Sequence, residues 1–145
     1  DTARAIAAQV AEALDYQGIL GVEFFVNHDG SLVVNEMAPR PHNSGHHTLD
    51  ACATSQFEQQ LRVALGLPLG STKLISSCVM LNLLGDFWPG ETEPPDWTPL
   101  LQTEGAVLHL YGKRRAGGMR KMGHATLLGP GALEKAVELK AGWLG

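Results

Sequence analysis

Gly21-Val-Glu-Phe-Phe-Val-Asn-His-Asp-Gly-Ser-Leu-Val-Val-Asn-Glu36 contains two runs of β-branched and aromatic residues separated by a polar turn. The runs predict strands over residues 21–26 and 32–36, and the Asp29-Gly30 pair is a strong signal for a hairpin with a two-residue loop. A loop of that length sets the pairing of the two strands. The predicted pairs are His28 with Ser31, Phe25 with Val34, and Glu23 with Glu36.

The opposed carboxylates of Glu23 and Glu36 predict a metal site. Directly opposed residues share one face of a sheet, with Cβ atoms about 4.5 to 5.5 Å apart, and carboxylates that close repel unless they share a proton or a cation. Mg²⁺ (or Mn²⁺) suits the pair because it takes oxygen ligands from carboxylates and substrate phosphates. The alternative is a solvated face on which Arg40 screens both charges. A one-residue slip would send Glu23 to the other face.

The second strand continues into Asn35-Glu-Met-Ala-Pro-Arg-Pro-His-Asn-Ser-Gly-His46, which is dense in chemically useful side chains. Its two prolines break regular pairing, so we expect an irregular loop in which backbone and side chains can both meet a ligand. Arg40 offers a planar fork for phosphate or carboxylate. His42, His46 and His47 suggest zinc, but no helical His-x-x-x-His with a third ligand supports it.

Outside this region, periodicity and turn signals predict an α+β fold in two parts, residues 1–70 and 71–145. Apolar spacing predicts a helix over residues 2–16 and a helical region over 48–65, where Ser55 is a candidate cap with Glu58 completing a capping box. The part after Leu67-Pro-Leu-Gly-Ser71 reads as a small β-rich domain. Its predicted elements are strands 76–84, 106–111 and 120–128 and a helix over 131–139. Its tryptophans are interpreted as packing residues.

A basic segment interrupts this second part. Five of the eleven Lys and Arg residues lie between positions 113 and 121, although the chain carries a net charge of −4. This contrast suggests an anion site, and a solvated loop is the alternative that the residues alone leave open. Nucleic acid is not expected as a partner, because no aromatic residues interleave with the charges. The five residues are Lys113, Arg114, Arg115, Arg120 and Lys121.

The composition also argues against a membrane protein and favours a reduced cellular compartment. No apolar run approaches the roughly 20 residues that span a bilayer, so no membrane partner is expected. The two cysteines, Cys52 and Cys78, form no spaced metal motif, which favours a reduced, cytoplasmic setting. No P-loop sequence is present.

Residues 35–46, together with Leu108-His-Leu-Tyr-Gly-Lys113 and Arg120-Lys-Met-Gly-His124, resemble 5-(carboxyamino)imidazole ribonucleotide synthase, an ATP-grasp family of purine biosynthesis. A sister family, the formate-dependent glycinamide ribonucleotide transformylases, shares the Pro-Arg-Pro-His run but continues with Asp-Thr-Gly-Met. The residues Asn43, Ser44 and His46 therefore favour the carboxylating family.

The resemblance implies that this chain is a C-terminal fragment: the end of an ATP-grasp domain (helix, β-hairpin, loop, helix) followed by a small β-rich domain. It also implies a reaction in which ATP phosphorylates bicarbonate to carboxyphosphate, and the amine of 5-aminoimidazole ribonucleotide captures the carboxyl group. We expect the parent protein to be a cytoplasmic homodimer and the fragment alone to be inactive. Another ATP-grasp ligase, using formate, and a non-catalytic anion-binding module remain the alternatives.

The resemblance also implies roles for individual residues. Many ATP-grasp enzymes carry a further metal-binding Asn where this chain has Ala38, so the metal would rest on two carboxylates. By this resemblance, Glu23 and Glu36 bind Mg²⁺, and Asn35 and Glu36 contact the nucleotide. Bicarbonate or its phosphorylated form is bound by Arg40, His42 and Asn43, and His46 orients the acceptor. The phosphate of the ribonucleotide is bound by Lys113, Arg120 and Lys121.

Overall fold

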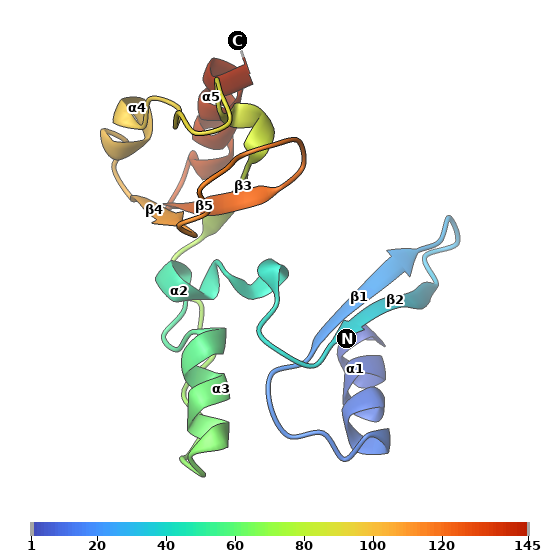
Figure 1. Ribbon diagram of the computed structural model, residues 1–145. Helices are drawn as coiled ribbons and strands as arrows, with labels where there is room; N and C mark the ends of the chain where they lie inside the picture. Colours follow the sequence, from blue (N-terminus) through green and yellow to red (C-terminus); the bar gives the residue numbers. More distant parts are fainter. Residues whose placement is uncertain (1, 145) are drawn as a thin grey trace. The chain divides into compact units, whose positions relative to one another are not determined.

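The computed structural model describes residues 2–144, which form two compact units with a mixed α+β fold (Figure 1). One unit runs to Leu49 and includes Ala53–Lys73, and the other comprises Asp50–Cys52 and the chain from Leu74 onward. No helix among residues 2–144 has the length and hydropathy needed to cross a membrane. The first unit contains α1 (Thr2–Ala13), β1 (Gly21–Val26), β2 (Leu32–Ala38), η1 (Asn43–Gly45) and α3 (Gln56–Ala64).

The predicted hairpin is present, but its loop is one residue longer than expected. The Asn27 amide donates to the Ser31 carbonyl at 2.9 Å, which leaves three residues in the loop. The Asp29 carboxylate accepts hydrogen bonds from the Ser31 hydroxyl and amide, which lower its pKa, and Gly30 takes a left-handed φ of 81°. These features are typical of a three-residue loop. The predicted pairing of His28 with Ser31 and of Phe25 with Val34 is therefore wrong.

A β-bulge at Asn35 restores the predicted pairing at the end of the hairpin that lies away from its turn. Phe24 lies opposite Val34, whereas Glu23 lies opposite Glu36, so Asn35 is an extra residue in β2. Such an insertion shifts the register by one position and bends the strand. The predicted opposition of Glu23 and Glu36 is confirmed for this reason, although the loop length that suggested it is wrong.

The helical region predicted over residues 48–65 is two helices, α2 (Thr48–Ala51) and α3. Cys52 leaves the helix to form a β-bridge with Leu74, and the Ser55 side chain accepts from the Glu58 amide to begin α3. The predicted cap is confirmed. The Glu58 carboxylate does not close a capping box, because it binds the Arg62 guanidinium one turn later at 2.7 Å.

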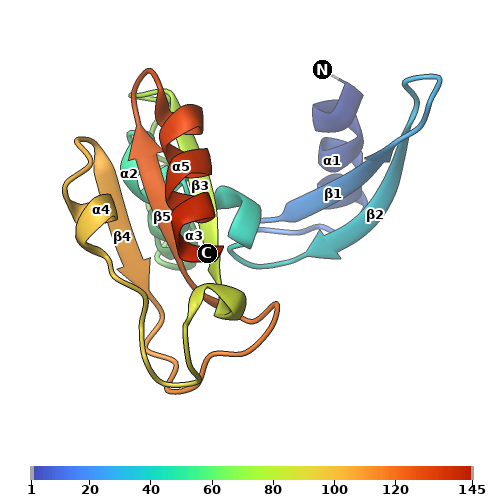
Figure 2. The ribbon, with the colours of Figure 1, turned by 90° about the horizontal axis from the view of Figure 1, so that it is seen from above.

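The second unit is built on an antiparallel sheet in the order β3-β5-β4. Helix α5 lies across one face of this sheet (Figure 2), and the core between them contains Leu83, Ala125 and Leu127, each no more than 1% exposed. Trp88, Trp97 and Trp143 pack against this core, as predicted. The elements of this unit are β3 (Cys78–Leu84), η2 (Gly85–Phe87), α4 (Thr98–Leu101), β4 (Ala106–Leu110), β5 (Lys121–Leu128) and α5 (Ala132–Leu144).

The opposite face of this sheet is polar. Because side chains alternate along a strand, His124 and Thr126 of β5 point away from α5. Both are nevertheless buried, at 1% and 0% exposure. A buried row of polar groups is therefore part of the interior of the second unit.

Replacement of Leu83 by alanine should destabilise the second unit by about 2 to 5 kcal/mol, because the side chain is fully buried and its removal leaves a cavity. The effect can be followed by tryptophan emission during urea unfolding, since Trp88, Trp97 and Trp143 all lie in that unit. Leu133→Ala, at a side chain that is 59% exposed, is the matched control and should cost less than about 0.5 kcal/mol. Equal shifts in the two variants would contradict the assigned core.

Candidate active site

The paired carboxylates of the first unit have the composition of a Mg²⁺ site. Glu23 and Glu36 are direct partners across β1 and β2, so both side chains lie on one face of the hairpin. The Glu36 side chain is exposed, and that of Glu23 is 44% exposed. Carboxylate oxygens on adjacent strands are the ligands that Mg²⁺ prefers. Ala38 is buried and supplies no third oxygen ligand from its side chain.

The bulged residue Asn35 lies directly before Glu36 and is exposed. Bulges commonly occur beside active sites, where they change the direction of a side chain. The predicted contact of Asn35 with a nucleotide stays a prediction, but its place in the bulge shows why its side chain does not follow the ordinary alternation of β2.

His42 connects the carboxylates to the loop that follows β2. Its Nε2 lies 3.5 Å from Glu23 Oε1, and its Nδ1 lies 2.9 Å from the Ser44 hydroxyl at the start of η1. The ring approaches β1 closely, because a Cβ on Gly21 would lie 2.9 Å from the His42 Cβ. Glycine at position 21 therefore allows this histidine to reach the glutamate.

Gln56, which the sequence patterns did not single out, holds the loop in place. Its Oε1 accepts from the His42 amide at 2.9 Å, and its Nε2 lies 2.7 Å from the His42 carbonyl and 2.8 Å from His46 Nδ1. The residue is 8% exposed, and a Cβ on Gly45 would lie 2.5 Å from its Oε1. Since an amide nitrogen only donates, His46 Nδ1 accepts, and a neutral His46 carries its proton on Nε2.

Arg40 and Asn43 complete the predicted set in this loop. The Arg40 guanidinium is exposed and donates to the Pro41 carbonyl at 3.1 Å. The Asn43 Oδ1 is buried and has no hydrogen-bond partner among residues 2–144. A buried acceptor without a partner is costly, which is typical of a group that meets a ligand. Among the predicted residues, the structure joins Glu23 to Glu36 and to His42, and Gln56 joins His42 to His46. Asn35, Arg40 and Asn43 are neighbours of these residues in sequence.

The basic segment lies in the second unit, between β4 and β5. The Lys113 ammonium donates to the Lys121 carbonyl, and the Arg120 guanidinium donates to the Arg115 carbonyl at 3.0 Å. These bonds bring Lys113 next to the start of β5, and all three predicted phosphate ligands are exposed. The Arg115 guanidinium lies 4.0 Å from the Glu91 carboxylate, and both side chains are about three-quarters exposed, so this pair contributes little.

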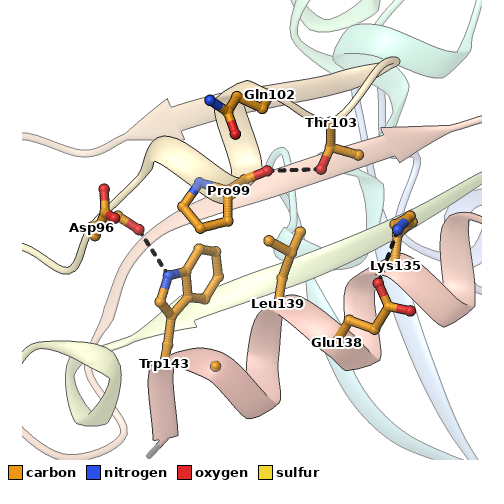
Figure 3. Close-up of a pocket in the computed structure, with 9 residues that line it drawn as sticks. Asp96, Pro99, Gln102, Thr103, Lys135, Glu138, Leu139 and Trp143 are labelled. Carbon is orange, nitrogen blue, oxygen red and sulfur yellow. Dashed lines mark hydrogen bonds and ion pairs between the residues drawn. The ribbon is translucent and has the colours of Figure 1, made fainter.

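A cavity of about 450 Å³ lies on the α5 side of the second unit (Figure 3). Trp143 donates from its indole to the Asp96 carbonyl at 3.0 Å, and Lys135 pairs with Glu138 at 2.9 Å. None of the predicted site residues lines this cavity. We therefore assign this cavity no part in the chemistry.

Comparison with known proteins supports the resemblance in both units. Residues 1–57 match the family model of the ATP-grasp domain, and residues 78–136 match that of the phosphoribosylaminoimidazole carboxylase C-terminal domain. N5-carboxyaminoimidazole ribonucleotide synthase of Brucella melitensis is 53% identical over 130 residues, which are 90% of this chain and 34% of the relative. The chain is similar to N5-carboxyaminoimidazole ribonucleotide synthases over most of its length. The family resemblance inferred from residues 35–46 and 108–124 is confirmed.

Solved structures of this family share the fold. The synthetase from Thermotoga maritima aligns with a TM-score of 0.86 and 49% identity, covering 97% of this chain and 40% of that one. The synthase from Aspergillus clavatus in complex with ADP and 5-aminoimidazole ribonucleotide aligns with a TM-score of 0.80 and 34% identity, covering 97% and 38%. The chain spans about a third of the length of the curated relatives that it matches. Members of the family are ATP-dependent ligases of the ATP-grasp type.

Replacement of Gln56 by leucine should loosen the loop over residues 42–46, because it removes the acceptor of the His42 amide and the donor to His46. Leaving buried polar groups unpaired costs about 1 to 3 kcal/mol, so amide exchange in this loop should accelerate roughly tenfold or more. Hydrogen–deuterium exchange measured by mass spectrometry checks this. Gln9→Leu, on the exposed side of α1, is the control and should leave the loop unchanged. Unchanged exchange in Gln56→Leu would refute the role of Gln56.

Proposed function

We propose that this chain supplies part of the active site of an enzyme that carboxylates 5-aminoimidazole ribonucleotide to N5-carboxyaminoimidazole ribonucleotide, using ATP and bicarbonate, in de novo purine biosynthesis. The opposition of Glu23 and Glu36 beside the loop that Gln56 binds is the observation that carries the proposal. Support also comes from a relative that binds ADP and 5-aminoimidazole ribonucleotide.

Phosphoryl transfer from ATP to bicarbonate is largely a matter of positioning and charge neutralisation. Glu23 and Glu36 would hold Mg²⁺ (or Mn²⁺), which neutralises phosphate charge when bound. Asn35, placed beside Glu36 by the bulge, would contact the nucleotide. His42 lies 3.5 Å from Glu23 and keeps this carboxylate oriented.

Bicarbonate and carboxyphosphate would be bound by the loop after β2. Arg40 presents an exposed planar cation, and His42 and Asn43 follow it in the same loop. His46, whose Nδ1 accepts from Gln56, would orient the acceptor. Carboxyphosphate releases phosphate as CO₂ forms, and the substrate amine then makes the new C–N bond and loses a proton.

The phosphate of the ribonucleotide would be bound by Lys113, Arg120 and Lys121. The bond from the Lys113 ammonium to the Lys121 carbonyl holds Lys113 against the start of β5, where Arg120 and Lys121 are neighbours in sequence. Arg120 adds a fork that matches two phosphate oxygens. Anchoring the phosphate at a distance from the amine uses binding energy to orient the reacting nitrogen. We also infer a cytoplasmic homodimer, and the free thiols of Cys52 and Cys78 are consistent with that compartment.

The proposal is tested by ATP consumption in the longest protein that contains this sequence, measured with and without bicarbonate and 5-aminoimidazole ribonucleotide. Consumption should require both substrates. Glu36→Gln should lower kcat by roughly 100-fold or more, because one of two metal-binding carboxylates is lost. Lys113→Ala should mainly raise the KM for the ribonucleotide. Glu12→Gln and Lys140→Ala, both at exposed helical positions, are the controls and should retain activity.

Three results would contradict the proposal. Consumption that is indifferent to the ribonucleotide, or that accepts formate in place of bicarbonate, indicates another ATP-grasp ligase. Nucleotide binding without turnover, unaffected by Mg²⁺ or by Glu36→Gln, indicates a non-catalytic anion-binding module.

A further inference from the structure

A second cluster of ligand-type side chains lies on the polar face of the β3-β5-β4 sheet. His109 of β4 and His124 of β5 are direct cross-strand partners, with ring centroids 4.4 Å apart. The Asp50 carboxylate, from α2, places its oxygens 3.0 and 3.1 Å from His109 Nε2. One ligand atom from each of the three residues lies within 4.8 Å of the others. All three belong to the second unit, and none has a role in the proposed carboxylation.

The cluster is anchored by buried contacts. His124 is 1% exposed, and its Nδ1 shares a hydrogen bond of 2.9 Å with the Tyr111 hydroxyl. Burial raises the pKa of Tyr111, which keeps the phenol neutral. The side chains of Asp50 and His109 are 12% and 30% exposed. One histidine is therefore fixed, while the other two groups have room to adjust.

Two buried polar atoms close to the cluster in the sheet also indicate a missing ligand. Asn82 lies opposite His124 on β3, and Thr126 follows two residues later on the same face of β5. The Asn82 Oδ1 and the Thr126 Oγ1 are buried and have no hydrogen-bond partner within residues 2–144. Thr126 is 0% exposed. Buried polar atoms are rarely left unpaired, and a water molecule bound to a metal ion would supply the missing partners.

We propose that Asp50, His109 and His124 bind a divalent transition-metal ion of the Zn²⁺ class. Two imidazoles and one carboxylate form a donor set that suits Zn²⁺, whereas Mg²⁺ prefers oxygen ligands alone. With the ion on His124 Nε2, the Nδ1 proton is donated to the Tyr111 oxygen. This arrangement matches the outer-shell partner that metal-binding histidines ordinarily have.

To accommodate the ion, His109 must leave its stacked position on His124, where the ring planes differ by 15°, and turn its Nε2 toward the His124 Nε2. Ligands at about 2.0 to 2.2 Å from Zn²⁺ lie roughly 3.3 Å from one another in a tetrahedral site. The Asp50 oxygens and His109 Nε2 already lie 3.0 to 3.1 Å apart. Rotation of the His109 and Asp50 side chains toward His124 closes the remaining gap. The ion replaces the Asp50–His109 hydrogen bond, so no buried group is left unpaired.

The nearby thiols are not part of this donor set. Among residues 2–144, the group of ligand atoms that lie within 4.8 Å of one another consists of Asp50, His109 and His124, and neither Cys52 nor Cys78 belongs to it. The proposed site therefore offers two nitrogens and one carboxylate from protein, with water completing the coordination.

The experiment is a Co²⁺ and Zn²⁺ titration of the untagged 145-residue protein in excess Mg²⁺, which occupies carboxylate-only sites. Co²⁺ should produce visible absorption of a nitrogen- and oxygen-ligated ion at one equivalent, and Zn²⁺ should displace it. His109→Gln and Asp50→Asn should each weaken binding roughly 100-fold or more. Tyr111→Phe should weaken it about 10- to 100-fold, as expected for an outer-shell partner.

Two matched controls exclude other histidines. His28→Gln, in the exposed hairpin loop, and His47→Gln, beside the loop of the first unit, should leave the affinity unchanged. Unaltered tryptophan emission in each variant shows that the second unit is folded. Absence of stoichiometric binding, binding that survives both His109→Gln and Asp50→Asn, or loss of binding in either control would overturn the proposal.

Discussion

Two carboxylates that face each other across antiparallel strands are the main constraint on the candidate site of the first unit. Two like charges on one face are unfavourable without a cation or proton between them, so Glu23 and Glu36 are a cost to the isolated hairpin. The bulge at Asn35 is what places them opposite each other, since the loop alone sets a register that is one residue different. A structural irregularity therefore brings the two candidate metal ligands opposite each other.

The loop after β2 shows how an irregular segment can still hold side chains in defined positions. Two prolines prevent it from pairing as a strand, so its backbone groups must find other partners. Gln56 supplies them by bonding to both the amide and the carbonyl of His42. Gly21 and Gly45 make the approach possible, because side chains at either position would collide with His42 or Gln56. Helix α3 thus holds the loop in position through Gln56, which is an uncharged residue.

Local patterns predicted the elements well and the connections less well. The strands and most helices follow from apolar periodicity, and the dense motif at residues 35–46 contains most of the candidate site residues of the first unit. The loop length was wrong, because the Asp29 side chain and the left-handed Gly30 stabilise a third loop residue. The pairing of Glu23 with Glu36 nevertheless held, since the bulge offset the error. Gln56 was missed because its partners are distant in sequence and appear only when the chain folds.

The same physical rule creates both clusters of ligand-type residues. Antiparallel pairing brings Glu23 to Glu36 and His109 to His124, although no spacing rule for short metal motifs connects either pair. The chemistry of the two pairs differs, because exposed carboxylates favour a hard cation that exchanges with substrate, whereas stacked, partly buried imidazoles favour a softer and more permanent one. Short sequence spacings indicate metal motifs on helices and in loops, as with His42, His46 and His47, but not pairs on neighbouring strands. Cross-strand partners become visible only once the register is known.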